Sequence, residues 1–222
     1  WKIVCNPASK FSAQQNAGAV TPPTGFTNYL GITSSSAYSV SSSEYQAFSQ
    51  VVEGYNVADL GWGTANAKTI TVSFWARSSL TGTFGGSIRD AAGLRSYPFS
   101  YSISSANTWE KKAVVVTGDT TGTWLTTNGI GLVLYLGLGV GTTFSAAAGA
   151  WAAGNYLSAT GATSVVGTSG ATFYVTGVQL EEGNAATSFE FRSYGTELAL
   201  AQRYFVKYGG EVSTEIVSSG LG

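Results

Sequence analysis

Two segments decide the fold: NVADLGWGTANAKTITVSFWARSSLTGTFGGS (residues 56–87) and YPFSYSISSANTWEKKAVVVTGDTTGTW (residues 97–124). In both, apolar and polar residues alternate with period two, and clusters of Gly, Thr and Asn separate the alternating runs. Alternation of this kind buries one face of each strand, and the clusters between the runs mark turns. The pattern therefore predicts an antiparallel β-sandwich.

Strand signals continue on both sides of these segments. Eight segments carry them in chain order: 26–33, 44–54, 68–78, 83–90, 97–104, 108–118, 131–140 and 172–183. Eight strands suit a two-sheet jelly roll. Helical periods are missing between them, which argues against a parallel sheet with crossover helices.

The chain divides into three parts on this reading. Residues 1–25 are polar, contain a Thr-Pro-Pro-Thr-Gly break and read as a lead-in or linker with little regular structure. The sandwich spans 26–192. The last part, 193–222, holds a short helix at Thr196–Tyr204, with Thr196 as its N-cap, and the start of a C-terminal extension. Its apolar stripe of Leu198, Ala201 and Phe205 needs a partner, on the sandwich or on a neighbouring chain.

Composition excludes several classes of function. Only 10% of the residues are charged and the net charge is −1, so no basic surface for nucleic acid is present. The sequence has no histidine and one cysteine, Cys5. Ser-His-Asp and Cys-His nucleophile systems, zinc sites of His and Cys ligands, and an intrachain disulfide are therefore excluded.

The ends and the apolar runs of the sequence carry two further expectations. The chain begins at Trp1 and contains no methionine, which reads as a processed or partly observed polypeptide without a secretory leader. No apolar run approaches the ~18 residues of a membrane helix, so we expect no membrane insertion.

One strand face suggests a polar ligand surface. In TVSFWAR (71–77), Val72, Phe74 and Ala76 should face the core, and Trp75 and Arg77 should face the other way. In the strand 172–183, Tyr174, Val178 and Leu180 should form the apolar face. The candidate glycan-binding face is therefore assembled from side chains on the opposite faces: Gln50, Trp75, Arg77, Gln179 and Glu181. The alternative is a cross-strand ion pair between Arg77 and Glu181, with Trp75 laid over it.

Other large aromatic residues have two readings. Trp62 and Trp124 lie in turns, and Trp151 and Tyr156 lie in the long low-complexity stretch 142–170. Each is either an exposed contact for a ligand or a plug that anchors a loop to the sandwich. Tyr97, Phe99 and Tyr101 share one strand face and are predicted in the core, with their phenol tips at its rim.

No catalytic residue is expected. Glu181 and Glu182 are neighbours on a strand, so they point to opposite faces and do not flank one bond. Asp59, Asp90 and Asp119 lie in or beside turns, where Asp often binds its own backbone. The sequence also shows no acidic loop for calcium, and we expect no metal site and no cofactor.

Several segments resemble a recurring module of bacteriophage tail and fibre proteins. They are YNVADLGWGTANAKTITVSFW (55–75), SYPFSYSISSANTWE (96–110), GDTTGTW (118–124) and TFYVTGVQLEEGNAATSFEFRSYGTELALAQRYF (172–205). Together they cover most of Tyr45–Phe205. Such modules look like jelly rolls of the galactose-binding or carbohydrate-binding-module type placed on virion structural proteins. Many jelly rolls of this resemblance hold a structural calcium.

The resemblance implies a location and a role. It implies a virion structural protein, a tail-fibre or tail-appendage module that contacts host surface glycan and self-associates, as fibres do, into a homotrimer. Other virion proteins would then be its partners. Two alternatives stay open: an architectural virion protein (capsid decoration or tail assembly) without a ligand, and a carbohydrate-binding accessory domain of a secreted enzyme.

Overall fold

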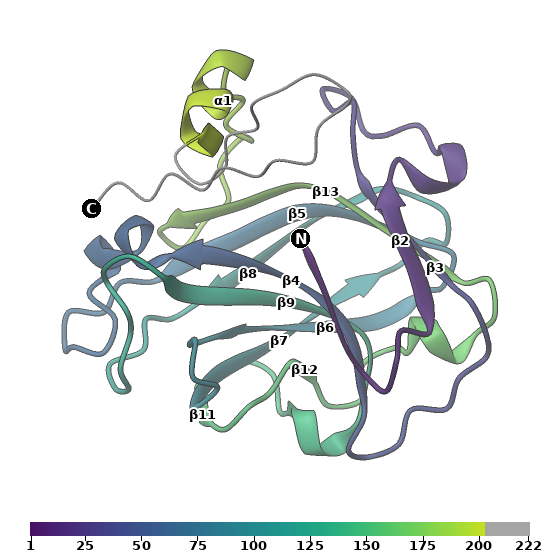
Figure 1. Ribbon diagram of the computed structural model, residues 1–222, viewed down its shortest axis with the longest axis horizontal. Helices are drawn as coiled ribbons and strands as arrows, with labels where there is room; N and C mark the ends of the chain where they lie inside the picture. Colours follow the sequence, from purple (N-terminus) through teal and green to yellow (C-terminus); the bar gives the residue numbers. More distant parts are fainter. Residues whose placement is uncertain (203–222) are drawn as a thin grey trace, which may run out of the picture. The chain divides into compact units, whose positions relative to one another are not determined.

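Two antiparallel sheets face each other in this computed structural model, which describes residues 1–202 (Figure 1). We call the six-stranded sheet sheet A; its strands in spatial order are β1 (Lys2–Asn6), β4 (Tyr45–Glu53), β9 (Ile130–Val140), β6 (Gly82–Arg89), β7 (Arg95–Ile103) and β11 (Ala152–Ala153). We call the five-stranded sheet sheet B; its strands are β2 (Phe11–Gln15), β3 (Leu30–Ser34), β13 (Thr172–Glu182), β5 (Ile70–Ser78) and β8 (Glu110–Val116).

Short elements complete the described chain. Two-residue strands β10 (Ser145–Ala146) and β12 (Ser158–Ala159) pair in parallel. The 3-10 turns are η1 (Ala17–Ala19), η2 (Gly54–Asn56), η3 (Ala58–Leu60), η4 (Thr142–Phe144) and η5 (Val165–Gly167). One α-helix, α1 (Tyr194–Gln202), lies in the described part. The predicted antiparallel two-sheet sandwich with a short C-terminal helix is confirmed.

All eight predicted strands form, as β3, β4, β5, β6, β7, β8, β9 and β13. Their alternating residues pack between the sheets as expected. Val72, Phe74 and Ala76 are each fully buried, and so are Phe48 of β4 and Phe84 of β6. Because sheets pack about 10 Å apart, these inward side chains fill one continuous core.

The prediction that residues 1–25 lack regular structure is wrong. This segment contains β1 and β2, and each joins a different sheet: β1 pairs with β4 in sheet A, and β2 pairs with β3 in sheet B. Both are edge strands whose side chains are mostly exposed. Their sequences, KIVCN and FSAQQ, therefore lack the alternation that marks a half-buried strand.

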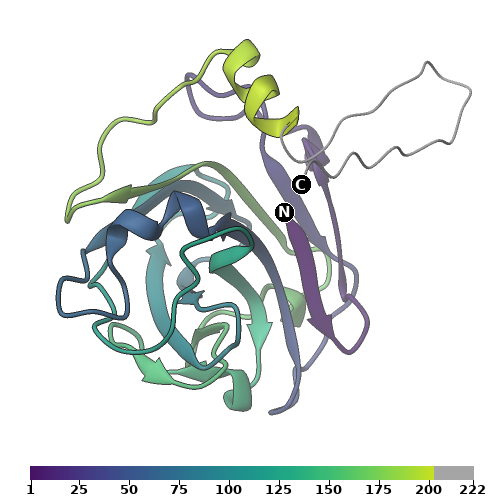
Figure 2. The same cartoon turned by 60° about the vertical axis from the view of Figure 1, so that its left-hand side comes forward.

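The long stretch 142–170 is anchored on the outer face of sheet A. Leu157 is 2% exposed and joins Ala47, Val133 and Tyr135 in a second, smaller apolar cluster. Ser158 lies against two glycines of sheet A: a Cβ at Gly85 or Gly137 would come 2.3 or 2.7 Å from its hydroxyl oxygen. The absence of side chains at these two positions thus lets the stretch lie directly on the sheet (Figure 2).

The chain separates into two compact units, residues 1–187 and 188–222, and the second is described as far as residue 202. In the second unit, α1 begins at Tyr194, two residues before the predicted start. The Ser193 hydroxyl accepts a hydrogen bond from the Thr196 backbone N–H (3.4 Å), so Ser193 takes the capping role predicted for Thr196. Residues 203–204 of the predicted helix, stripe residue Phe205 and the extension that follows lie outside the described residues.

Within residues 1–202, no helix has the length and apolar character needed to cross a membrane.

Candidate functional site

Four of the five predicted ligand residues lie on the outer face of sheet B. Cross-strand neighbours share a face, and Trp75 pairs with Thr176 and Arg77 with Tyr174. Farther along the same two strands, Ser73 pairs with Gln179 and Thr71 with Glu181. Arg77 lies six positions after Thr71 on β5. At ~3.3 Å per residue, the four side chains are therefore spread over about 20 Å.

The predicted ion pair between Arg77 and Glu181 does not form. The Arg77 guanidinium Nε donates to the Asn107 carbonyl (2.9 Å), and its carbon lies 5.2 Å from the centre of the Tyr174 ring. Glu181 accepts hydrogen bonds from the Thr187 hydroxyl (2.7 Å) and backbone N–H (2.9 Å), which lower its pKa. Each charge is thus held by its own local partners.

Chain segments cover part of this face. Phe26 and Trp75 pack around Gly177, since a Cβ there would come 2.6 Å from the Phe26 ring and 3.4 Å from the Trp75 ring. The Trp109 indole N–H donates to the Thr21 carbonyl (2.8 Å), which holds the β2–β3 connection over the sheet. The predicted residues therefore do not form one open platform.

A β-bulge explains one error in the predicted faces. The pairing of β13 with β5 shifts register between Thr176 and Gln179, at Gly177, whose φ is +58°. A bulge changes which face the following residues occupy. Tyr174 therefore lies on the outer face with Gln179, and not with Val178 and Leu180, which pack against the core.

Gln50 is separated from the other four predicted residues. It lies on β4 in sheet A, paired with Leu134, whose side chain is in the core. Its side chain therefore faces sheet B across the sandwich, and it lines a pocket that is described below.

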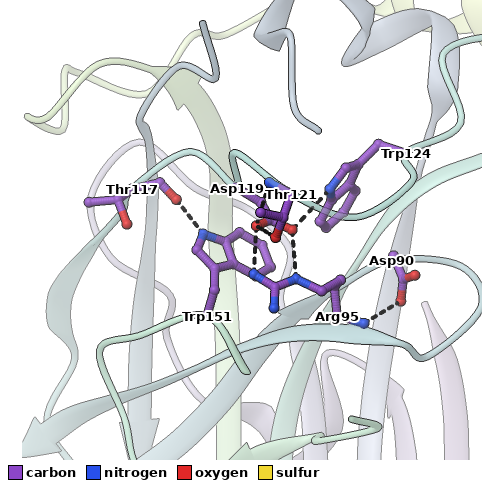
Figure 3. A network of polar contacts seen from close by, with 7 residues as sticks. All are labelled: Asp90, Arg95, Thr117, Asp119, Thr121, Trp124 and Trp151. Carbon is purple, nitrogen blue, oxygen red and sulfur yellow. Dashed lines mark hydrogen bonds and ion pairs between the residues drawn. The ribbon is translucent and has the colours of Figure 1, made fainter. Parts of the chain in front are cut away.

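The aromatic residues of the turns form a buried cluster. Trp62 and Trp124 are 7% and 9% exposed, so the prediction that they are exposed contacts is wrong. Trp62, Trp124 and Trp151 meet edge to face, with ring centres 4.7–5.3 Å apart. Trp151 is half-buried, and its indole N–H donates to the Thr117 carbonyl (2.6 Å; Figure 3). Tyr156 is half-buried too, with its ring against Gly154.

A buried carboxylate holds this end of the sandwich together (Figure 3). Asp119 receives hydrogen bonds from Arg95 through Nε (2.9 Å) and Nη2 (2.6 Å), from the Thr121 backbone N–H (3.2 Å) and from the Trp124 indole (3.2 Å). Asp90 accepts from the Arg95 backbone N–H (3.1 Å). Both carboxylates are thus used in structure, in the turn positions where the sequence placed them.

A pocket of about 500 Å³ opens between the edges of the two sheets, within the range typical of small-ligand sites. Sheet A contributes Trp1 and Gln50, and sheet B contributes the start of β3 and the bulge of β13. Within the described residues, the lining consists of Trp1, Gln15, Asn28, Tyr29, Leu30, Gln50, Val175, Thr176, Gly177 and Val178. It combines aromatic rings, aliphatic side chains and three carboxamides.

The orientation of the carboxamides follows from their hydrogen bonds. The Asn28 Oδ1 accepts from Gln15 Nε2 (2.8 Å) and Asn16 Nδ2 (2.9 Å). Gln50 Nε2 donates to the Val51 carbonyl (3.1 Å). Because only the NH₂ of an amide can donate, these bonds leave Oε1 of both glutamines as the acceptor that remains. Neither Oε1 accepts a hydrogen bond from residues 1–202.

The Trp1 ring supplies an apolar surface in the same pocket. It is 48% exposed and meets Phe48 edge to face, with ring centres 5.3 Å apart. Sequence reasoning did not select Trp1. Phe48 and Gln50 lie two residues apart on one strand, and this alternation is the signal that Gln50 faces inward.

Metal and acid–base chemistry find no support in the described residues. Across residues 1–202, no three Cys, Asp or Glu side chains gather closely enough to hold a metal ion, and the sequence has no histidine. Glu181 and Glu182 pair with Thr71 and Ile70 on adjacent positions of β5, and so point to opposite faces. The pocket offers hydrogen bonding and stacking.

Comparison with known proteins gives structural similarity alone. No protein-family model matches the chain, and no curated protein matches it by sequence. Among solved structures, it is similar to the enzymatically active domain of bacteriophage CBA120 tailspike protein 4 (12% identity, TM-score 0.44), covering 82% of this chain and 19% of that one. This chain thus spans less than a fifth of the tailspike chain.

The chain is similar to two further solved structures whose names refer to carbohydrate or sugar binding. One is the family 11 carbohydrate-binding module from Clostridium thermocellum in complex with a β-1,3-1,4-mixed-linked tetrasaccharide (11% identity, TM-score 0.41, 84% and 91% of the two chains). The other is a putative sugar binding protein from Bacteroides thetaiotaomicron VPI-5482 (10% identity, TM-score 0.43, 82% and 86%). The two-sheet antiparallel β-sandwich of this chain is established by its own strand pairing.

Proposed function

We propose that this chain binds a glycan in the pocket between the sheet edges. The observation that carries the proposal is the pocket lining itself, in which the exposed Trp1 ring and three carboxamides come together. Sugar rings have apolar C–H faces that stack on aromatic rings and hydroxyl groups that pair with planar amides. A concave, mostly apolar site with a few oriented polar groups is the usual form of a ligand pocket.

The outer faces of the sheets are less suited to this role. The stretch 142–170 covers part of sheet A, and the β2–β3 connection covers part of sheet B. Trp75, Arg77, Gln179 and Glu181 are spread along the partly covered face of sheet B. The pocket, in contrast, gathers its polar groups around one volume.

For the biological setting, we propose a tail-fibre or tail-appendage module of a phage virion that contacts host surface glycan. The support is the sequence resemblance of the segments quoted above. An architectural virion protein without a ligand and an accessory domain of a secreted enzyme remain the competing settings.

The experiment is glycan binding by wild type and matched variants. A glycan array identifies a ligand, and calorimetry then compares wild type with Trp1→Ala, Gln50→Ala and the control Tyr55→Ala. Tyr55 is an exposed aromatic residue (53%) outside the pocket lining. We expect both pocket variants to weaken binding at least tenfold and the control to bind as wild type does. Equal binding by all three variants would exclude the pocket, and an empty array would contradict glycan binding.

Exposed apolar residues in the second unit support self-association, which we propose as a trimer. Tyr194, Leu198 and Leu200 of α1 are 80%, 40% and 47% exposed. Surface of this kind, carried on so short a helix, is stabilised by a partner. The mass of the full chain in solution tests this: we expect three copies, and a monomer at high concentration would refute it.

A further inference from the structure

We infer that the pocket between the sheet edges selects uncharged sugar residues and rejects sugars that carry a carboxylate, sulfate or phosphate. This inference rests on the proposed glycan-binding function and adds the class of ligand. Its basis is the charge and hydrogen-bonding character of the lining.

Among residues 1–202, no charged side chain belongs to the lining. The nearest charge along β1 also points away from it. Lys2 pairs with Ser49 on the outer face of sheet A, whereas Trp1 and Gln50 face inward. An anionic sugar entering the pocket would lose water without gaining a cation, which costs free energy.

The polar groups in the pocket favour hydroxyl donors. Oε1 of Gln15 and Oε1 of Gln50 are the acceptors left after the carboxamides satisfy their protein partners. The Tyr29 hydroxyl already donates to the Ala17 carbonyl (2.9 Å), and the Thr176 hydroxyl donates to the Asn28 carbonyl (2.7 Å). A sugar hydroxyl can donate to the remaining carboxamide oxygens. A carboxylate only accepts, so it cannot use these oxygen atoms and is left with the remaining carboxamide N–H groups.

The test uses pairs of ligands that differ only in charge. Suitable probes are a methyl glucoside and its glucuronide, a methyl galactoside and its galacturonide, and an acidic polysaccharide before and after reduction of its carboxyl groups. Binding is measured by calorimetry at about 0.15 M salt, where charges farther than about 8 Å are screened. A neutral peptide is kept ahead of Trp1 so that no α-amino charge contributes.

We expect the neutral member of a bound pair to bind at least tenfold more tightly than the acidic one. Gln50→Lys places a cation among the acceptors, and should reduce or reverse that ratio. Leu94→Lys adds the same charge at a site that is 67% exposed and outside the lining, and should leave the ratio unchanged.

The possible results separate this inference from the proposed function. Equal or tighter binding of acidic members by wild type would overturn the inference and leave glycan binding standing. An unchanged ratio in Gln50→Lys would also overturn it, because the selectivity would then arise elsewhere. If no member of any pair binds, the proposed function fails and the inference fails with it.

Discussion

Asp119→Asn should destabilise the sandwich far more than the location of Asp119 in a turn suggests. The Asp119 side chain is 2% exposed and that of Arg95 is 21% exposed. Removing the charge weakens both hydrogen bonds from Arg95 and leaves a largely buried guanidinium without its counter-ion. The Thr121 and Trp124 donors lose the same charged acceptor.

The magnitude follows from the two bonds that Arg95 donates. A hydrogen bond to a charged group contributes about 1.5–3 kcal/mol, and breaking a buried ion pair costs about 3–5 kcal/mol. Because Arg95 keeps some access to water, we take the lower end, about 3 kcal/mol. In a domain of this size, each kcal/mol of lost stability lowers Tm by about 2–4 °C. A loss of about 3 kcal/mol therefore lowers Tm by roughly 6–12 °C.

The effect should depend on pH in a defined direction. Burial alone would raise the pKa of Asp119, but hydrogen bonds from Arg95 and Thr121 outweigh it and lower the pKa below 3.8. A lowered folded-state pKa means that the stabilisation is present above about pH 4 and is lost as pH falls through the folded value. The difference between wild type and Asp119→Asn should therefore shrink in acid.

Urea unfolding between pH 7 and pH 3 measures both effects. The matched control is Glu182→Gln, the same chemical change in an ion pair with Lys68 whose side chains are 44% and 50% exposed. Such an exposed pair contributes little to stability. The reasoning is refuted if Asp119→Asn is no more destabilising than the control at pH 7, or if its effect stays constant down to pH 3.

Two other pairs of substitutions test packing by the same unfolding assay. Tyr101→Phe removes a buried hydroxyl that has no partner among the described residues, so it should be neutral or stabilising. Tyr29→Phe loses a hydroxyl bonded to Ala17 and should cost about 1 kcal/mol of stability; the reverse order would contradict this. Gly31→Ala places a Cβ 2.7 Å from that of Ala17 and should cost roughly 1–3 kcal/mol, while Gly195→Ala, with open space in α1, should cost nothing; equal effects would refute the crowding.

Strands buried on one face could be predicted because alternation along the sequence reports burial directly. Residues 70–78 show this most clearly, with Val72, Phe74 and Ala76 fully buried. The edge strands β1 and β2 could not be predicted in this way, because most of their side chains are exposed and only Phe11 and Ala13 of β2 pack against the main core. Edge strands are recognised by their pairing, which is non-local.

The candidate site was less predictable for two physical reasons. The bulge at Gly177 moves one residue out of register, and it reversed the face of Tyr174 relative to Val178. The tryptophan cluster and the pocket join segments far apart in sequence, such as Trp62 with Trp151 and Trp1 with Val178. Such contacts leave no local signal.

The arrangement of these segments also explains where a ligand can enter. The stretch 142–170 occupies part of the outer face of sheet A, and the β2–β3 connection lies over part of sheet B. Between the sheet edges, β3 begins only at Leu30, so β13 continues past it unpaired on that side through its bulge. That local gap in pairing opens the pocket beside Trp1 and Gln50. The edge strands that the sequence pattern did not reveal add Trp1, just ahead of β1, and Gln15 of β2 to a lining that otherwise lies on or beside β3, β4 and β13.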